Sequence, residues 1–364
     1  MENSKKINGK EVLRRILGIF AIPALVVLVV MIVCLSTGKM ILTTDNAFYG
    51  FTRYAAVVFL TTIALSINLG SGRFDFSLGS IATLSSVLAA KATYAMLSGA
   101  TGSGTVTLFL SLLFGAILGL ASGGLYVLLR LPPIITSLEV TLIYEGITFA
   151  ITGGSNVKAE IDNASMTFFR TNWWIHLIIV LVVLLVIYIV FDRSKFGYSY
   201  RSLRAGQRIS VNTGIREVPN AIICYGICGA LMGVVGFLQA LPGNYISTSV
   251  LNFGSIGIMF SAFLPMFIGG FIGRYSNDKI GYLIAAICMS LISSMFSLYS
   301  DNTIMASVQS IVIAALLVLF LIFLNNEETC KSLVNGTFIK TVRRHIAERK
   351  EAAKKEQSNG QTQE

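Results

Sequence analysis

The sequence predicts an all-α polytopic membrane protein with about ten transmembrane helices, and two observations carry this prediction. Of its 364 residues, 54% are hydrophobic and 13% are charged, whereas charged residues make up roughly 25% of an average soluble domain. Apolar runs of about 20 residues, the length that crosses the hydrocarbon core of a bilayer, recur along the whole chain. They cover residues 16–36, 51–69, 78–97, 106–129, 133–151, 173–191, 219–241, 255–273, 280–298 and 303–324.

The distribution of lysine and arginine predicts that both termini face the cytoplasm (N-in/C-in). If the spans alternate in direction from a cytoplasmic N-terminus, 23 of the 28 cations fall in cytoplasmic segments and 3 in outer loops. The other two, Arg53 and Lys91, fall within spans. Membrane proteins carry their excess of cations on the cytoplasmic side, so this asymmetry supports an even number of spans.

The first span is predicted to stay attached to the protein. It follows five cations, as a signal peptide does, but its apolar run of about 20 residues is longer than the usual hydrophobic region of such a peptide. No convincing small-residue cleavage site follows it. We therefore interpret residues 16–36 as an uncleaved transmembrane helix.

The third and fifth spans are the weakest of the series, because charged residues interrupt them. Lys91 lies in the third, and Glu139 and Glu145 lie in the fifth. Either span is predicted to be short, broken or re-entrant. The two glutamates are six residues apart and do not share one helix face, which disfavours a proton relay. Contact with a solute, structural pairing and interfacial placement remain open for all three side chains.

Glycine-rich polar interruptions separate several of the spans, namely residues 68–77, 152–156 and 269–273. Backbone that leaves helical geometry at membrane depth is buried in protein or lines a wet cavity, and ordinary interfacial loops are the alternative. Within the spans, glycines such as Gly115 and Gly119 predict close packing between helices.

A long basic segment, residues 191–217, lies between the sixth and seventh spans. A polar segment of this length predicts a docking site for a cytoplasmic partner, and the alternative is a loop that only fixes the topology. Arg201, Arg204 and Arg208 of this segment recur at helical spacing and are predicted to face an acidic groove. Its cations are Arg193, Lys195, Arg201, Arg204, Arg208 and Arg216.

Several classes of function are disfavoured by missing motifs. The sequence contains no G-x-x-x-x-G-K-[ST] phosphate loop, so we expect no ATP hydrolysis by this chain alone. It has only two histidines, His176 and His345, and no His-Glu-x-x-His motif, so we expect no metal site and no Ser-His-Asp catalysis. Its five cysteines are predicted to be packing residues without a disulfide framework. We therefore expect neither an enzyme nor a bound cofactor, and an intramembrane enzyme is the least favoured reading.

The chain is predicted to divide into a transmembrane domain, residues 1–330, and a charged tail, residues 331–364. Within the tail, residues 337–355 have the composition of a basic amphipathic helix that lies on the inner leaflet. A solvated cytoplasmic extension is the alternative.

Four further segments follow one another along the chain. They are Asp75-Phe-Ser-Leu-Gly-Ser80, Pro133-x-x-Thr-x-Leu138 with Glu145-Gly and Thr152-Gly-Gly, the stretch from Phe196 to Ile215, and Gly269-Gly270. In order and spacing they resemble ribose-type sugar permeases of ABC transporters, within the branched-chain amino acid and ribose permease superfamily. Each motif is weak alone, and the four together cover most of residues 45–325. The chain departs from the family pattern at Arg73, at Glu145 and over 274–279, and these departures concern the solute more than the fold.

The resemblance implies a type II ABC importer permease, a multi-pass subunit of the bacterial cytoplasmic (inner) membrane. It would pair with a second copy or a sister permease, with cytoplasmic ATPase subunits that use the ATP, and with an extracytoplasmic solute-binding protein. Residues implied to couple to the ATPase are Lys195, Phe196, Gly197, Arg201, Arg204, Gly206, Arg208 and Gly214. Candidates for the translocation path are Asn68, Asp75, Ser77, Gly153, Gly154, Gln239, Gly269, Gly270 and Gln309.

The resemblance also implies the kind of solute, a sugar or a similar small polar molecule. A pentose such as ribose or a hexose is the first expectation, while a nucleoside or a signalling furanose stays open. The main alternative in function is a self-sufficient channel or secondary carrier, which would transport without ATP.

Overall fold

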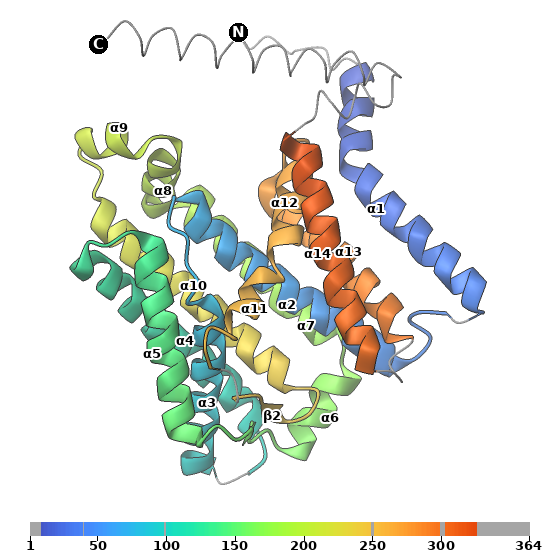
Figure 1. Ribbon diagram of the computed structural model, residues 1–364, viewed down its shortest axis with the longest axis horizontal. Coiled ribbons are helices and arrows are strands. Elements are labelled where there is room, and N and C mark those ends of the chain that lie inside the picture. Colours follow the sequence, from blue (N-terminus) through green and yellow to red (C-terminus); the bar gives the residue numbers. More distant parts are fainter. Residues whose placement is uncertain (1–8, 39, 98–99, 249–250, 299–302, 326–364) are drawn as a thin grey trace, which may run out of the picture. The chain divides into compact units, whose positions relative to one another are not determined.

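The structure is a computed structural model, and it describes residues 9–38, 40–97, 100–248, 251–298 and 303–325. The chain divides into two units, Met1–Ala306 and Ser307–Glu364. Figure 1 labels the elements. The helices before the basic segment are α1 (Gly9–Thr37), α2 (Asp45–Gly70), α3 (Leu78–Leu97), α4 (Ser103–Leu129), α5 (Pro133–Thr152), α6 (Asn163–Thr171) and α7 (Trp174–Tyr188).

A π-helical turn, η1 (Ile189–Arg193), extends α7 into the basic segment. The helices that follow are α8 (Lys195–Ala205), α9 (Gln207–Asn212), α10 (Glu217–Ala240), α11 (Ile256–Phe260), α12 (Phe263–Gly273), α13 (Asp278–Ser297) and α14 (Thr303–Asn325).

The helical, membrane-spanning architecture agrees with the sequence prediction. Within the described ranges, nine helical segments are long and apolar enough to cross a bilayer, and they correspond to the first nine predicted spans. The tenth predicted span is α14, whose described side chains include an apolar stretch over Ser307–Ile322. This helix falls almost entirely in the second unit.

The two spans interrupted by charged residues are continuous 20-residue helices, α3 and α5. Lys91 is exposed on α3, whereas the Glu145 carboxylate on α5 is buried and hydrogen-bonded. The break falls in the eighth span instead, where Ser261 and Ala262 separate α11 from α12. The expectation of a short, broken or re-entrant span at either place was therefore wrong. Exposure of Lys91 and hydrogen bonding of Glu145 satisfy these charges without a break in either helix.

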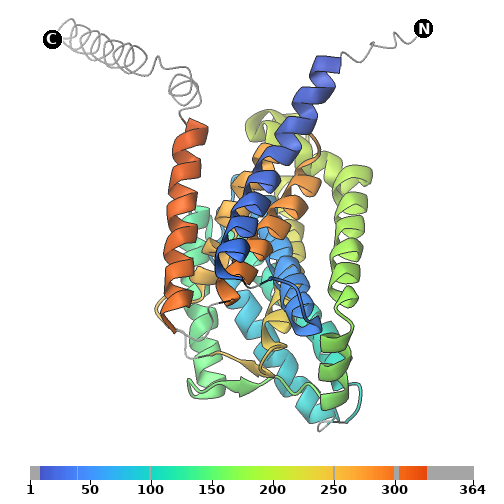
Figure 2. The ribbon, with the colours of Figure 1, turned by 90° about the vertical axis from the view of Figure 1, so that its right-hand side faces the viewer.

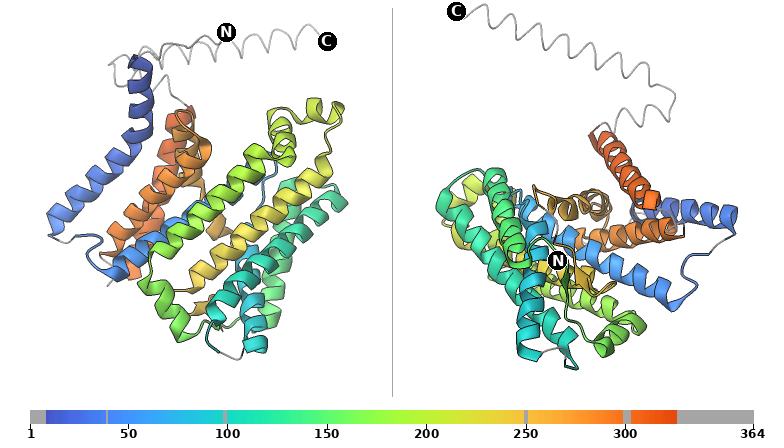
Figure 3. Two further views of the ribbon diagram at one scale, coloured as in Figure 1. Left: turned by 180° about the vertical axis from the view of Figure 1, so that it is seen from behind. Right: turned by 60° about the horizontal axis from the view of Figure 1, so that its bottom comes forward.

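The core of the first unit is built on α2 and α10. In the most apolar stretch of each helix, 72% of the residues of α2 and 78% of those of α10 are buried, against 6% for α1. Helices α2 and α10 are therefore central and α1 is peripheral. Helix α10 packs against α2, α3 and α4, while α13 packs against α1, α2 and α12. Figures 2 and 3 show this arrangement from the side and from behind.

Close packing of α4 on α10 depends on glycine, as the sequence predicts. A Cβ atom on Gly229 would collide with the Gly115 carbonyl oxygen and lie 2.7 Å from the Cα atom of Gly119. A Cβ atom on Gly233 would likewise collide with the backbone of Ser111. These positions bring the two helix backbones into direct contact, the role that small residues play between membrane helices.

A small cap of loops closes the end of the first unit at which α5 ends and α6 begins. The strands β1 (Val157–Lys158) and β2 (Tyr245–Ile246) pair antiparallel there, a minor exception to the all-α prediction. The Asn244 side chain both accepts from the amide and donates to the carbonyl of Ile161. Figure 1 shows this cap at one end of the helices and α8 with α9 at the other.

The Asp162 carboxylate joins two helix starts in this cap. Its Oδ1 atom accepts from the Ser103 hydroxyl at 2.9 Å, at the start of α4, and its Oδ2 atom accepts from the Ser165 amide at 3.1 Å, at the start of α6. Partial burial opposes ionisation, but the hydrogen bonds from Ser165, Ser103 and Gly104 lower the pKa of Asp162 to about 2. The carboxylate is therefore charged under all ordinary conditions.

The predicted tail, with its boundary at residue 330 and the predicted amphipathic helix 337–355, lies outside the described residues. Within the described chain, Cys34, Cys224, Cys228 and Cys288 are free thiols, and the last three are buried. Their positions in apolar helices fit the predicted packing role.

Candidate translocation cavity and coupling segment

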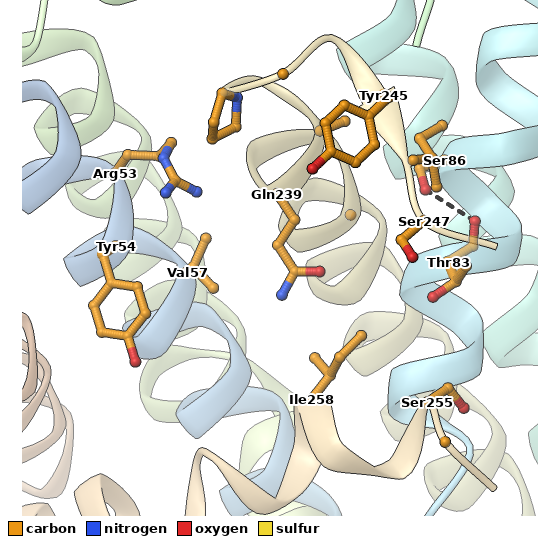
Figure 4. Close-up of a pocket in the computed structure, with 16 residues that line it drawn as sticks. Arg53, Tyr54, Val57, Thr83, Ser86, Gln239, Tyr245, Ser247, Ser255 and Ile258 are labelled. Atoms are coloured by element: carbon orange, nitrogen blue, oxygen red, sulfur yellow. Dashed lines mark hydrogen bonds between the residues drawn. The ribbon is translucent and has the colours of Figure 1, made fainter. Parts of the chain in front are cut away.

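A cavity of about 520 Å³ lies among α2, α3, α10 and α11, next to the cap (Figure 4). Its walls come from three long helices and from two chain segments after α10. It is lined by Arg53, Tyr54, Val57, Thr83, Ser86, Gly236, Gln239, Ala240, Pro242, Gly243, Tyr245, Ile246, Ser247, Gly254, Ser255 and Ile258.

The chemistry of this lining suits a small polar solute. Figure 4 shows Arg53 and Gln239 projecting into the same space from α2 and α10, with Tyr245 and Ser247 on the segment opposite. Hydroxyl, amide and guanidinium groups supply donors and acceptors, and the two tyrosine rings supply apolar faces. A volume of this size with few polar anchors is typical of a small-molecule site.

Part of the cavity wall is held in place by Glu145 from α5. Its Oε1 atom accepts from the Ser255 amide at 2.9 Å and from the Ser255 hydroxyl at 2.6 Å, and its Oε2 atom accepts from the Phe253 amide at 3.0 Å. The glutamate is 3% exposed. Ser255 lines the cavity, so Glu145 acts on the cavity through the wall and does not line it.

The segment that Glu145 holds is strained. Asn252 and Phe253 have φ angles of +57° and +67°, in the left-handed region that side-chain-bearing residues rarely adopt. Gly79 of α3 presses against the same segment, because a Cβ atom there would lie 2.7 Å from the Ser255 carbonyl carbon. Strained backbone persists only where its surroundings fix it, and here a buried carboxylate and a close helix contact do so.

Three of the predicted path residues form a separate buried cluster at the turn between α2 and α3. The Asp75 carboxylate accepts from the Asn68 side chain at 2.9 Å, from the Ser77 amide at 2.9 Å and from the Ser77 hydroxyl at 2.6 Å. None of the three lines the cavity described above. Their hydrogen bonds close the turn that starts α3, which is the capping role of such side chains.

The predicted glycine positions of the path serve helix ends and crossings. Gly153 and Gly154, with φ angles of +65° and +72°, end α5 in a left-handed turn. A Cβ atom on Gly269 would lie 2.8 Å from the Tyr282 amide nitrogen, so this glycine brings α12 against α13, while Gly270 faces open space. Among the predicted path residues, only Gln239 lines the cavity. Gln309 lies on α14, in the second unit.

The basic segment folds into two short helices, α8 and α9, that meet at Gly206. Helix α8 lies on the ends of the membrane helices, because the buried Tyr200 hydroxyl donates to the Ile67 carbonyl of α2 at 2.9 Å. Burial raises the pKa of the Tyr200 phenol well above its usual range, so the hydroxyl keeps its proton. Gly197 sits against η1, where a Cβ atom would lie 2.7 Å from the Cα atom of Phe191.

Ion pairs link α8 to the starts and ends of neighbouring helices. Asp192 pairs with Lys279 of α13 and, at 4.0 Å, with Arg201. Arg204 pairs with Asp278 at 3.6 Å. These contacts surround a small cavity of about 160 Å³. Arg201 and Arg204 thus face acids of their own chain, although about half of each side chain stays exposed to solvent.

The other predicted coupling residues have distinct places. Phe196 packs on Phe191 with ring centroids 5.6 Å apart, and Lys195 is exposed at the start of α8. Gly206 has an extended backbone that any residue adopts, and it places Arg208 on a separate helix from Arg201 and Arg204. Gly214 has a φ angle of +91°, which favours glycine at the turn before α10.

The surface that α9 offers to a partner is apolar and basic. Ile209 is 74% exposed and Val211 is 42% exposed, and the exposed Arg208 lies beside them. Sequence reasoning identified the arginine and missed the two apolar neighbours. It also missed Arg53 as part of the cavity, although charge within an apolar span is the signal that marks such residues. For Glu145 it left structural pairing open, which agrees with the hydrogen bonds to the cavity wall.

The comparisons with known proteins give the family. A family described as "Branched-chain amino acid transport system / permease component" matches residues 47–321, which is most of the chain. The chain belongs to this family. It is therefore the permease component of an ABC importer and not its ATPase, and it is a multi-pass membrane protein like the bacterial permeases of this kind. No solved structure is detectably similar to the permease.

Its relatives are distant and differ in the solute that they are named for. The ribose import permease of Escherichia coli is 21% identical over 316 residues, which cover 84% of this chain and 93% of the relative. The galactofuranose transporter permease of Escherichia coli is 22% identical over 66% of this chain and 68% of the relative. The nucleoside ABC transporter permease of Lactococcus lactis is 24% identical over 58% of this chain, which spans only 61% of that relative's length.

Proposed function

We propose that this permease carries a sugar or a similar small polar solute through the membrane, driven by separate ATPase subunits that bind at α8 and α9. A second permease, identical or a sister chain, and an extracytoplasmic solute-binding protein complete the proposed importer. The relatives are named for ribose, galactofuranose, autoinducer 2 and nucleosides, all small polar molecules. A nucleoside is the second candidate, because two tyrosines line the cavity.

The observation that carries the coupling part of the proposal is the way α8 is held. One face is anchored on α2 by Tyr200 and tied to α13 through Asp192, Lys279 and Asp278. The opposite side of the segment, with Ile209 of α9, is open to a partner. A force applied to this segment would thus reach α2, which lines the cavity through Arg53, Tyr54 and Val57.

In this account the cavity holds solute at the outer end of the path, and α11 with the strained segment before it forms its movable wall. The predicted positions Asn68, Asp75, Ser77, Gly153, Gly154, Gly269 and Gly270 support the helices around the path, and Gln239 contacts the solute. The predicted role of Gln309 stays a proposal, since it lies in the second unit.

The coupling proposal is tested by reconstituting the permease with its ATPase in liposomes and measuring ATP turnover. The double substitution Arg208→Ala and Ile209→Ser removes exposed groups of α9 and leaves the ion pairs of α8 intact. We expect it to lower permease-stimulated turnover severalfold without changing the melting temperature.

Arg216→Ala is the matched control, since Arg216 is an exposed cation of the same segment beyond α9. It is expected to leave turnover unchanged. Equal turnover with the wild-type permease, the double variant and Arg216→Ala would show that the segment does not dock the ATPase. Solute uptake by the permease alone, without ATP, would favour the self-sufficient carrier.

A further inference from the structure

We propose that Arg53 makes the cavity selective for solutes that present an anionic or carbonyl oxygen, and that it excludes cationic solutes. The proposal rests on the proposed function in one respect, that the cavity is part of the solute path. It narrows the solute class by chemistry, from small polar molecules in general to those with a strong oxygen acceptor.

The guanidinium of Arg53 lines the cavity from the third turn of α2. Its Nη1 atom donates to the Leu238 carbonyl of α10 at 3.2 Å. Its Nε atom is buried and finds no hydrogen-bond partner in the part of the chain that the structure describes. The side chain therefore retains unused donor capacity next to the space where a solute would lie (Figure 4).

No carboxylate balances this charge among the described residues. The cavity lining contains neither aspartate nor glutamate, and Arg53 takes part in none of the ion pairs found there. A second cation, Arg170, lies nearby, since it donates to the carbonyl of the lining residue Pro242 at 3.3 Å. The other titratable side chains that interact with Arg53 are Tyr49, Tyr54 and the His176 ring.

An unpaired cation inside a membrane protein is costly and usually marks a solute or ion pathway. Low-dielectric walls focus its field into the cavity, which raises the local concentration of anions and lowers that of cations. A solute with a carboxylate, phosphate or carbonyl oxygen would also form charge-assisted hydrogen bonds with the guanidinium. A purely structural alternative exists, in which Arg53 only caps the carbonyl end of α10 through Leu238.

The two roles are separated by a chemical probe of the cavity that needs no knowledge of the natural solute. The full-length permease in detergent, carrying Gln239→Cys, is treated with an anionic sulfonatoethyl or a cationic trimethylammonioethyl methanethiosulfonate. Background labelling is taken from the parent chain with its native cysteines. Reaction with free 2-mercaptoethanol corrects for the intrinsic rates of the two reagents, and Thr171→Cys, at the exposed end of α6, reports labelling of a site outside the cavity.

We expect the corrected anionic-to-cationic rate ratio at Gln239→Cys to exceed one by roughly tenfold, given the strength of a charge interaction at partly buried sites. The further change Arg53→Gln keeps a donor for the Leu238 carbonyl and removes the charge, so the ratio should fall close to one. Arg53→Lys keeps the charge and should preserve the ratio. A capping role alone would leave the ratio unchanged in all three backgrounds, which would overturn the proposal.

If Arg53→Gln fails to fold, the salt dependence of the ratio in the Arg53 background decides instead. The ratio should fall as ionic strength rises from about 0.01 M to 1 M, because salt screens the charge, and a ratio that ignores salt would overturn the proposal. Labelling of Thr171→Cys but not of Gln239→Cys would show that the cavity is closed to solutes. That result would overturn the inference about Arg53. It would leave the proposed coupling to the ATPase untouched, because coupling is measured separately by ATP turnover.

Discussion

Glu145 offers the most direct test of how the cavity wall is held. Its carboxylate accepts three hydrogen bonds, two from Ser255 and one from Phe253. A hydrogen bond to a charged group contributes about 1.5–3 kcal/mol. Glu145→Ala removes all three acceptor contacts, and we expect it to cost on the order of 5 kcal/mol, because water from the adjacent cavity offsets part of the loss.

Glu145→Gln is the milder change and the more informative one. The amide oxygen can still accept from Ser255, but the amide nitrogen then faces the Phe253 N–H, donor against donor. We expect this variant to lose about 2–4 kcal/mol, the value of one charged hydrogen bond with some weakening of the others. A loss of this size should lower the melting temperature of the purified permease by several degrees.

Hydrogen exchange provides the local measurement. The amides of Phe253 and Ser255 should exchange faster in Glu145→Gln, because the strained turn at Asn252 and Phe253 is released. Glu139→Gln is the matched control on the same helix, since Glu139 is exposed. If Glu145→Gln and Glu139→Gln are equally stable and equally protected at these amides, the carboxylate does not hold the wall.

Two further predictions concern helix packing and the outer cap. Gly229→Ala should lower the melting temperature, because its methyl group would collide with Gly115 and overpacking costs about 1–3 kcal/mol. The control is Gly124→Ala on α4, whose methyl group would meet nothing within 4 Å and which should be neutral or stabilising. Equal effects of the two substitutions would contradict the packing account. The pKa of Asp162 is about 2 in the folded state, below the usual value of about 3.9, so its ionised form stabilises the fold above about pH 4 and this contribution is lost as the pH falls through 2. Thermal unfolding should therefore show Asp162→Asn to be less stable than wild type at neutral pH, with the difference vanishing on acidification; a difference independent of pH would refute this role.

The sequence predicted the spans well, because hydropathy and the constraint on backbone hydrogen bonds in lipid are local properties. The glycines of α4 and α10 were also interpreted correctly as packing residues. The break in the eighth span was not predicted, and neither was the strained segment before α11, which Glu145 holds across 108 and 110 residues of chain. A contact between segments so far apart leaves no periodic signal in a single sequence.

The candidate site was harder to predict than the fold. Asn68, Asp75 and Ser77 bond to one another at the turn before α3, which their short sequence separation allows, and their place along the path stays a prediction. Arg201, Arg204 and Arg208 were expected on one helical face, whereas the chain turns at Gly206 and two of the arginines pair with acids of η1 and α13. Asp278 is distant in sequence and Asp192 lies on the π-helical turn before α8, so the spacing of the arginines alone could not reveal these partners.

The central claim is that this permease moves its solute only when a separate ATPase works on it through α8 and α9. The most direct measurement compares uptake of radiolabelled ribose and of uridine, a nucleoside with carbonyl oxygens, into liposomes containing the permease, its ATPase and its binding protein, with and without ATP. The account predicts ATP-dependent uptake of one of these solutes, and loss of that uptake with Arg208→Ala and Ile209→Ser. Uptake by the permease alone, at the same rate with or without ATP, would contradict it.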